Sequence, residues 1–173
     1  EELKVGFNVL KEMQSIRGAF LHLIVLYSLL AALYVLTISL ASSIQSLGPT
    51  RFGTLLAASG IGMTFGAIVL AQIGNRFSRR HLSAAGLGLI AWTLVLLGES
   101  SSSLSFTLIL CGILGIGSAL VAIPAQTTIH EDAPEEKRGK IFGLQNNFIN
   151  IALSLPLVIT GALVSKYGLI PAL

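Results

Sequence analysis

The sequence predicts an all-α membrane protein with five complete membrane-spanning helices, and two observations support this fold class. Apolar residues make up 53% of the 173 positions and charged residues only 11%, with a mean hydropathy of +0.82, which is far from the composition of soluble domains. The charged residues also leave five long segments without Asp, Glu, Lys or Arg, at Gly18 to Thr50, Phe52 to Asn75, His81 to Gly98, Ser100 to His130 and Ile141 to Ser165.

Each charge-free segment is long enough for one span, because about 20 helical residues cross a hydrocarbon core of about 30 Å. The predicted spans are about 20–43, 53–74, 81–98, 104–128 and 141–165. A soluble bundle would need polar outer faces, which these all-round apolar segments lack. A membrane barrel would need alternating apolar and polar residues, which are also missing.

The two ends of the chain differ from the spans. In residues 1–17 the apolar side chains Leu3, Phe7, Leu10, Met13 and Ile16 recur near the helical period, which is typical of an interfacial helix, with a solvated linker as the alternative. Residues 169–173 form an apolar stub, and no initiator Met is present. We therefore expect a piece of a longer protein that ends in a truncated sixth helix.

The basic residues predict the orientation of the helices. Nine of the eleven Lys and Arg residues precede the first span or lie between spans two and three or four and five. Short cytoplasmic loops carry the basic residues, so this face and the N-terminus of the chain are expected inside. The same bias accounts for the pI near 9.3, because basic loops face the anionic lipids of the inner leaflet. A nucleic-acid partner is therefore not expected.

Small residues four apart predict where the helices pack, because lipid tails are as apolar as Leu and helices associate through close backbone approach. Gly62 with Gly66 and Gly139 with Gly143 have this spacing, and the fourth span adds the packing candidates Gly112, Gly115 and Gly117. Glycine at the density seen in the fourth span can also let a helix bend. In the following loop, Asp132 is expected to cap a helix that has Pro134 and Glu135 in its first turn.

Polar residues inside the spans are the candidates for a solute pathway. On the fifth span Asn146, Asn150 and Ser154 share one face, with Asn147 beside them. In a bilayer these amides must meet water or a partner, so they line a cavity or join helices. Tyr27 and Tyr34 share a face of the first span and predict two aromatic walls. Packing against neighbouring helices is the alternative for both tyrosines.

The absence of ionisable residues deep inside the spans is also informative. Proton relays need such residues, so a coupling carboxylate is expected outside this chain, and His22 is the only titratable group near an entrance. The uncharged spans favour a lipophilic or amphipathic solute. An intramembrane enzyme is the rival class, but the three His residues are scattered without a nucleophile or paired ligands. No metal site and no cofactor are predicted.

The run PAQTTIHEDAPEEKRGKIFGLQNNFINIALSLP, from Pro124 to Pro156, resembles the link between the tenth and eleventh helices of the major facilitator superfamily, particularly its bacterial drug and siderophore exporters. The resemblance covers essentially the whole chain. It implies that residues 18–173 are most of the second half of a twelve-helix facilitator fold, from the seventh to the eleventh helix. It also implies that residues 1–17 end the central cytoplasmic loop, and that a partner half of six helices is missing.

A second, weaker similarity lies between the second and third spans, where the family has the loop motif G-x-x-x-D-R-x-G-R-R. Arg76, Arg79 and Arg80 match its basic positions, whereas Asn75 replaces the Asp. The resemblance implies alternating access and makes these four residues, with Arg138, candidates for a cytoplasmic gate. The basic residues can instead be topology signals only.

The function expected from this resemblance is secondary active transport across the bacterial cytoplasmic membrane, in the direction of export. A membrane scaffold that transports nothing, or a half-size protein that dimerises, is the alternative. The upstream sequence separates these readings, because a full transporter would have six further spans there.

Overall fold

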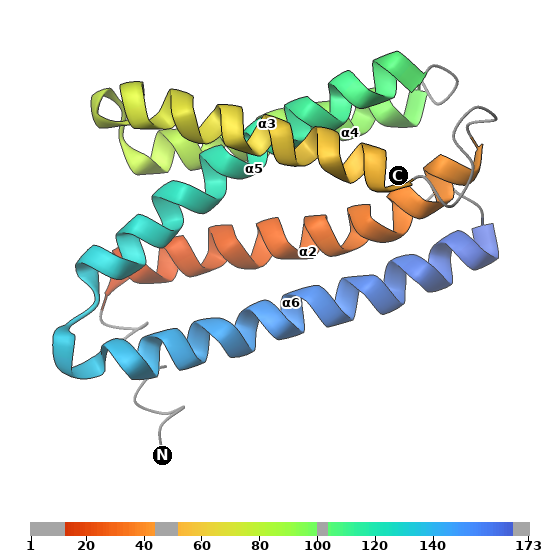
Figure 1. Cartoon of the computed structure of the whole chain (residues 1–173). Coiled ribbons are helices and arrows are strands. Elements are labelled where there is room, and N and C mark those ends of the chain that lie inside the picture. The colour runs from red at the N-terminus through yellow and green to blue at the C-terminus, as the bar shows by residue number, and fades with distance from the viewer. Residues whose placement is uncertain (1–12, 44–51, 100–103, 168–173) are drawn as a thin grey trace.

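The computed structural model describes residues 13–43, 52–99 and 104–167, which form five long helices and no strand (Figure 1). The helices are α2 (Gln14–Ser43), α3 (Phe52–Ile73), α4 (Arg79–Glu99), α5 (Leu104–Asp132) and α6 (Arg138–Tyr167), with short 3-10 turns η2 (Gly74–Arg76) and η3 (Glu135–Lys137). All five helices are long and apolar enough to cross a membrane. The predicted all-α membrane fold is therefore confirmed, while the stub 169–173 lies outside the described residues.

The helix boundaries differ from the predicted spans. The spans were bounded by charged residues, whereas a helix can continue past a charged residue and ends where its backbone conformation changes. Helix α2 begins at Gln14, so residues 14–17, the end of the predicted interfacial segment, belong to the first helix. Residues 1–12 lie outside the described part. Helix α5 runs past the first charged residues to Asp132 and stops just before Ala133, whose helical conformation is disfavoured by Pro134.

The predicted cap at Asp132 is wrong. Asp132 is the last residue of α5, whereas a capping residue needs a non-helical backbone. The turn η3 begins at Glu135 and has Pro134 as its N-cap, without a side-chain cap, and the following helix α6 begins only at Arg138. The D-x-x-E pattern therefore marks the end of one helix and a short turn.

Helix α5 occupies the centre of the bundle and crosses it diagonally in Figure 1. It packs against α3 and α4 on one side and against α2 on the other. Helix α6 packs mainly along α2 and lies at the edge of the bundle. One long side of α6 is therefore not covered by any other described helix.

Two apolar clusters hold these helices together. The first joins α2, α3, α4 and α5 around fully buried side chains, among them Leu26, Leu55, Ile90 and Leu110. The second joins the first half of α2 to the end of α5 and the start of α6, and it includes Leu23, Ile129 and Ile141. At its border Phe20 and Phe148 meet edge to face with ring centroids 6.1 Å apart. Helix α6 is thus anchored near its first half.

Helices α3 and α5 approach each other through their backbones. A Cβ atom added at Gly62 would overlap the carbonyl oxygen of Gly112, and one added at Gly115 would overlap the carbonyl oxygen of Ser59. One turn further along α3, a Cβ at Gly66 would lie 2.9 Å from the Cβ of Ala119. Glycine is the residue that permits this approach.

Helices α4 and α5 meet through a second glycine contact. A Cβ at Gly117 would lie 2.8 Å from Cγ1 of Ile90, and a Cβ at Gly86 would lie 2.7 Å from the carbonyl oxygen of Gly117. The role of Gly86 was missed because no second small residue four positions away marks it. In contrast, Gly139 and Gly143 have no atom within 4 Å of an added Cβ. Within the described residues no helix packs on them, so their packing role stays a prediction about a surface outside this chain.

Candidate functional site: the polar face of α6 and the basic end of the bundle

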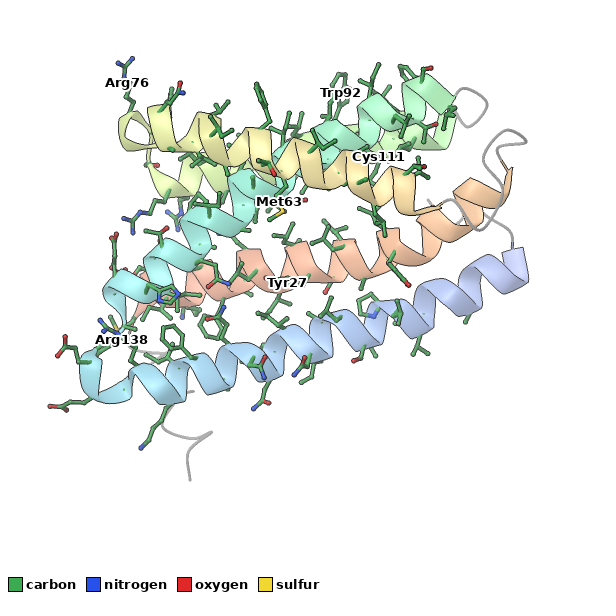
Figure 2. The ribbon with its side chains drawn as sticks, in the orientation of Figure 1. Tyr27, Met63, Arg76, Trp92, Cys111 and Arg138 are labelled. Atoms are coloured by element: carbon green, nitrogen blue, oxygen red, sulfur yellow. The ribbon has the colours of Figure 1, made fainter. Side chains whose placement is uncertain are left out.

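The predicted pathway residues of α6 lie on its open side. Asn146, Asn147, Asn150 and Ser154 are all exposed, and the stick view shows polar side chains along α6, away from the centre of the bundle (Figure 2). The Ser154 hydroxyl donates to the carbonyl oxygen of Asn150 at 2.8 Å. No described residue hydrogen-bonds the side-chain amides of Asn146, Asn147 or Asn150. The structure therefore brings these residues together on one face, where their amides remain available.

The two tyrosines predicted to line the pathway differ in their surroundings. Tyr27 is half-buried and packs against the apolar cluster shared by α2, α5 and α6. Tyr34, two turns further along α2, is 45% exposed. Tyr27 is the more buried of the two rings, so Tyr34 presents the larger exposed aromatic surface.

One polar contact between spans was missed in the sequence. Gln145 Nε2 donates to Gln126 Oε1 at 3.0 Å, which links α6 to α5, although Gln145 is only 8% exposed. An amide pair satisfies both groups in an apolar environment, which holds the two helices in register. Gln145 directly precedes Asn146, so it points to another face of α6. The signal was present, since every amide side chain in an apolar segment needs a partner or water.

Buried hydroxyls in the spans bond to their own helices. Thr93 donates to the carbonyl oxygen of Leu89 at 2.7 Å, and Ser118 donates to that of Leu114 at 2.9 Å. This is the usual way for a hydroxyl to be satisfied within lipid. These residues need no solute or water, and they were not predicted to line the pathway.

The predicted gate residues gather at one end of the bundle, where α4 begins and α5 passes into α6. Arg79 Nη2 donates to Glu131 Oε2 at 2.5 Å, and Nη1 approaches the Thr128 hydroxyl at 3.5 Å. The two charged side chains are 44% and 58% exposed. Water screens such a pair, which is worth about 0.2–1 kcal/mol. It joins α4 to α5, two helices that already pack closely.

The other gate residues are not paired with a carboxylate among the described residues. Arg76 is exposed at the end of η2 and projects away from the bundle in Figure 2. Arg80 is exposed in the first turn of α4. Arg138 starts α6, and its Nε is buried without a hydrogen-bond partner among the described atoms. Asn75 lies in η2, and its side chain is outside the described part of the structure.

The histidines show no metal-binding arrangement. The ring of His130 packs against Phe142 with centroids 4.8 Å apart, and His81 Nδ1 is 2.6 Å from the Ser78 hydroxyl. Among the described residues no three His, Cys, Asp or Glu side chains come together as metal ligands.

The geometry of the helices defines a class of protein. Five apolar helices of membrane-spanning length, with polar side chains along one open face and arginines at one end, make an integral membrane protein of several spans. Residues 15–172 match the model of the Major Facilitator Superfamily. The chain belongs to this family, whose members are membrane transporters rather than enzymes. No curated protein and no solved structure matches the chain.

Family membership confirms the predicted resemblance to the major facilitator superfamily. Transport across a membrane is the function class of this chain. Its placement in the second half of the fold, and the exporter branch, stay predictions.

Proposed function

We propose that the protein is a secondary active transporter that exports a small lipophilic or amphipathic solute across the bacterial cytoplasmic membrane by alternating access. The observation that carries this proposal is the open polar face of α6. Asn146, Asn150 and Ser154 are exposed along a helix of membrane-spanning length. Amides facing lipid tails are costly, so this face is expected to border an aqueous cavity.

The cavity needs a second wall, which the described residues do not supply. Helix α6 packs mainly along α2, and no other described helix covers its opposite side. In alternating access two halves of a transporter enclose a solute near the bilayer midplane. We propose that a second half of six helices faces the polar side of α6 and that Asn147 and Tyr34 also border the cavity.

The chemistry of the spans suggests the solute class. The five charge-free segments hold no carboxylate or cation deep in the membrane, so a multiply charged solute would lack a counter-charge. Tyr34 offers an exposed ring, and Tyr27 a half-buried one. Neutral amides with aromatic walls suit a solute that combines an apolar body with a few polar groups.

The gate is proposed at the basic end, on the cytoplasmic side. Arg76, Arg80 and Arg138 have no carboxylate partner among the described residues, so they are free to pair with groups of the other half in one state and to release them in the other. Arg79 is held by Glu131 and is proposed to support this end. Asn75 is proposed with them from its place in η2.

Transport by the complete gene product tests the proposal. Cells that express it are assayed for efflux of lipophilic cations, macrolides and siderophores, with Asn150→Leu as the pathway variant. Ile151→Leu is the matched control, because Ile151 is the next residue of α6 and is 60% exposed. We expect Asn150→Leu to lower efflux at least tenfold and Ile151→Leu to leave it unchanged.

Two results would contradict the proposal. Equal efflux by the two variants would show that Asn150 does not line the pathway. Accumulation of the solutes to the same level with and without the protein would show that the protein does not export them.

A further inference from the structure

A pocket of about 380 Å³ lies at the basic end, between the first turns of α2 and α4 and the last third of α5. This volume lies in the range of small-molecule sites, about 300–1,000 Å³. Gly18 and His22 line it from α2, Arg80 and Ser83 from α4, and Thr128 from α5. The pocket is separate from the polar side chains of α6, none of which is among its lining residues.

The charges around this pocket are positive. Arg79 and Arg80 both line it, and no Asp or Glu is among its described lining residues. Glu131 neutralises Arg79 from outside the lining. No described carboxylate lies within ion-pair distance of Arg80, and His22 lines the same pocket. The uncompensated guanidinium of Arg80 thus faces a pocket without a counter-ion.

One hydrogen-bond donor of the pocket also lacks a partner among the described residues. Ser83 is only 2% exposed, yet its hydroxyl makes no hydrogen bond with any described residue. The hydroxyl belongs to a residue that lines the pocket, so a ligand bound there can accept its hydrogen bond. The backbone of α4 begins at Arg79, beside the pocket, and the positive end of a helix dipole also favours an anion.

We propose that this pocket binds a phosphate group, with Arg80 and the Ser83 hydroxyl as its principal donors. A phosphate brings the negative charge that Arg80 lacks and acceptor oxygens for the hydroxyl. The phosphate comes from an anionic lipid headgroup of the inner leaflet or from a soluble phosphate. Basic pockets between membrane helices bind such headgroups. This site shares Arg80 with the proposed gate, but it depends neither on the direction of transport nor on the exported solute.

Binding by the purified complete protein tests the charge requirement. The protein is titrated in detergent with dioleoylphosphatidylglycerol, dioleoylphosphatidylcholine and, separately, inorganic phosphate at constant ionic strength, with the melting temperature as readout. We expect Arg80→Gln to weaken anion binding about fivefold or more, which corresponds to about 1 kcal/mol for one basic residue. Lys140→Gln is the matched control, since Lys140 is exposed at the same end and outside the pocket.

Steric and hydroxyl variants test the pocket itself. Gly18 lines it, and a Cβ added there meets no atom within 4 Å, so Gly18→Leu adds a side chain at the pocket wall whose first atom has room. Gly88→Leu is its control, because Gly88 is an exposed helical glycine with the same free space and no place in the lining. We expect Gly18→Leu to abolish binding and Gly88→Leu to preserve it. Ser83→Ala should weaken binding without loss of folded protein.

The outcomes distinguish a soluble phosphate from a lipid headgroup and show which results would contradict the proposal. Saturation by inorganic phosphate alone supports a soluble ligand, and a requirement for phosphatidylglycerol supports a lipid headgroup. Equal affinities for Arg80→Gln and Lys140→Gln would overturn the proposal, because they indicate only general attraction to a basic surface. Unchanged binding by Gly18→Leu would overturn it as well.

Discussion

The contact between α3 and α5 gives the sharpest prediction, at Gly62. In Gly62→Ala the new methyl group would overlap the carbonyl oxygen of Gly112 and lie 2.7 Å from its carbonyl carbon and 2.9 Å from its Cα. All three are backbone atoms, so no side-chain rotation relieves the overlap. The two helices must separate.

The magnitude follows from two opposing terms. Overpacking in a well-packed interior costs about 1–3 kcal/mol, and a backbone clash belongs at the upper end. Alanine improves the intrinsic helix propensity by about 1 kcal/mol. The net loss is about 2 kcal/mol, which lowers the ratio of folded to unfolded protein by a factor of about 30 and the melting temperature by about 4–8 °C for a domain of this size.

Gly60→Ala is the control for Gly62→Ala. Gly60 lies two residues earlier on α3, it is exposed, and a Cβ there meets no atom within 4 Å. It shares the propensity gain without the clash, so its melting temperature should stay equal or rise. Thermal unfolding of the complete protein in detergent, followed by the loss of the monodisperse gel-filtration peak, measures both variants. If Gly62→Ala were as stable as Gly60→Ala, the close backbone approach of α3 and α5 would be wrong.

Three further predictions concern other contacts. A double-mutant cycle of Gln126→Leu and Gln145→Leu should show a stabilising coupling of about 0.6–1.7 kcal/mol in thermal unfolding. A coupling of zero would show that the hydrogen bond between the two side chains does not contribute to stability. Ile90→Ala should cost about 2–5 kcal/mol of folding free energy, because Ile90 is 1% exposed in the core, while Val95→Ala, at a site 62% exposed on the same helix, should melt like the parent protein. Arg79→Gln should leave cysteine-accessibility labelling of the two membrane faces unchanged, whereas Arg76→Ala combined with Arg138→Ala should shift it. The reverse result would indicate that Arg79 acts in the gate and that Arg76 and Arg138 do not.

Membrane helices could be predicted from the sequence because the bilayer imposes one strong rule. Any segment long enough to cross it must be apolar and satisfy its own backbone, so the spacing of charges was sufficient to find five spans. The ends of the helices were less predictable. Charges mark the interface, whereas α5 continues to Asp132 and stops because of Pro134.

Contacts between helices were harder to predict, because they depend on which faces meet. Gly62, Gly66 and Gly115 could be selected from their spacing, but Gly86 has no such pattern and is recognised only through the carbonyl of Gly117. Gln145 was overlooked for a similar reason. It differs from Asn146 by one position, and only the direction of its face shows that it meets Gln126.

The positions of the glycines bear on how the proposed gate can work. Glycine contacts join α3 and α4 closely to α5, so these three helices are expected to move as one unit, because packed interiors change between discrete arrangements. The pair of Arg79 and Glu131 lies within this unit, and breaking it cannot separate α4 from α5. A group that opens and closes must instead bridge this unit and a body that moves against it. Arg76, Arg80 and Arg138 lack carboxylate partners among the described residues. They can therefore form an ion pair with the moving body in one conformation and lose it in the other.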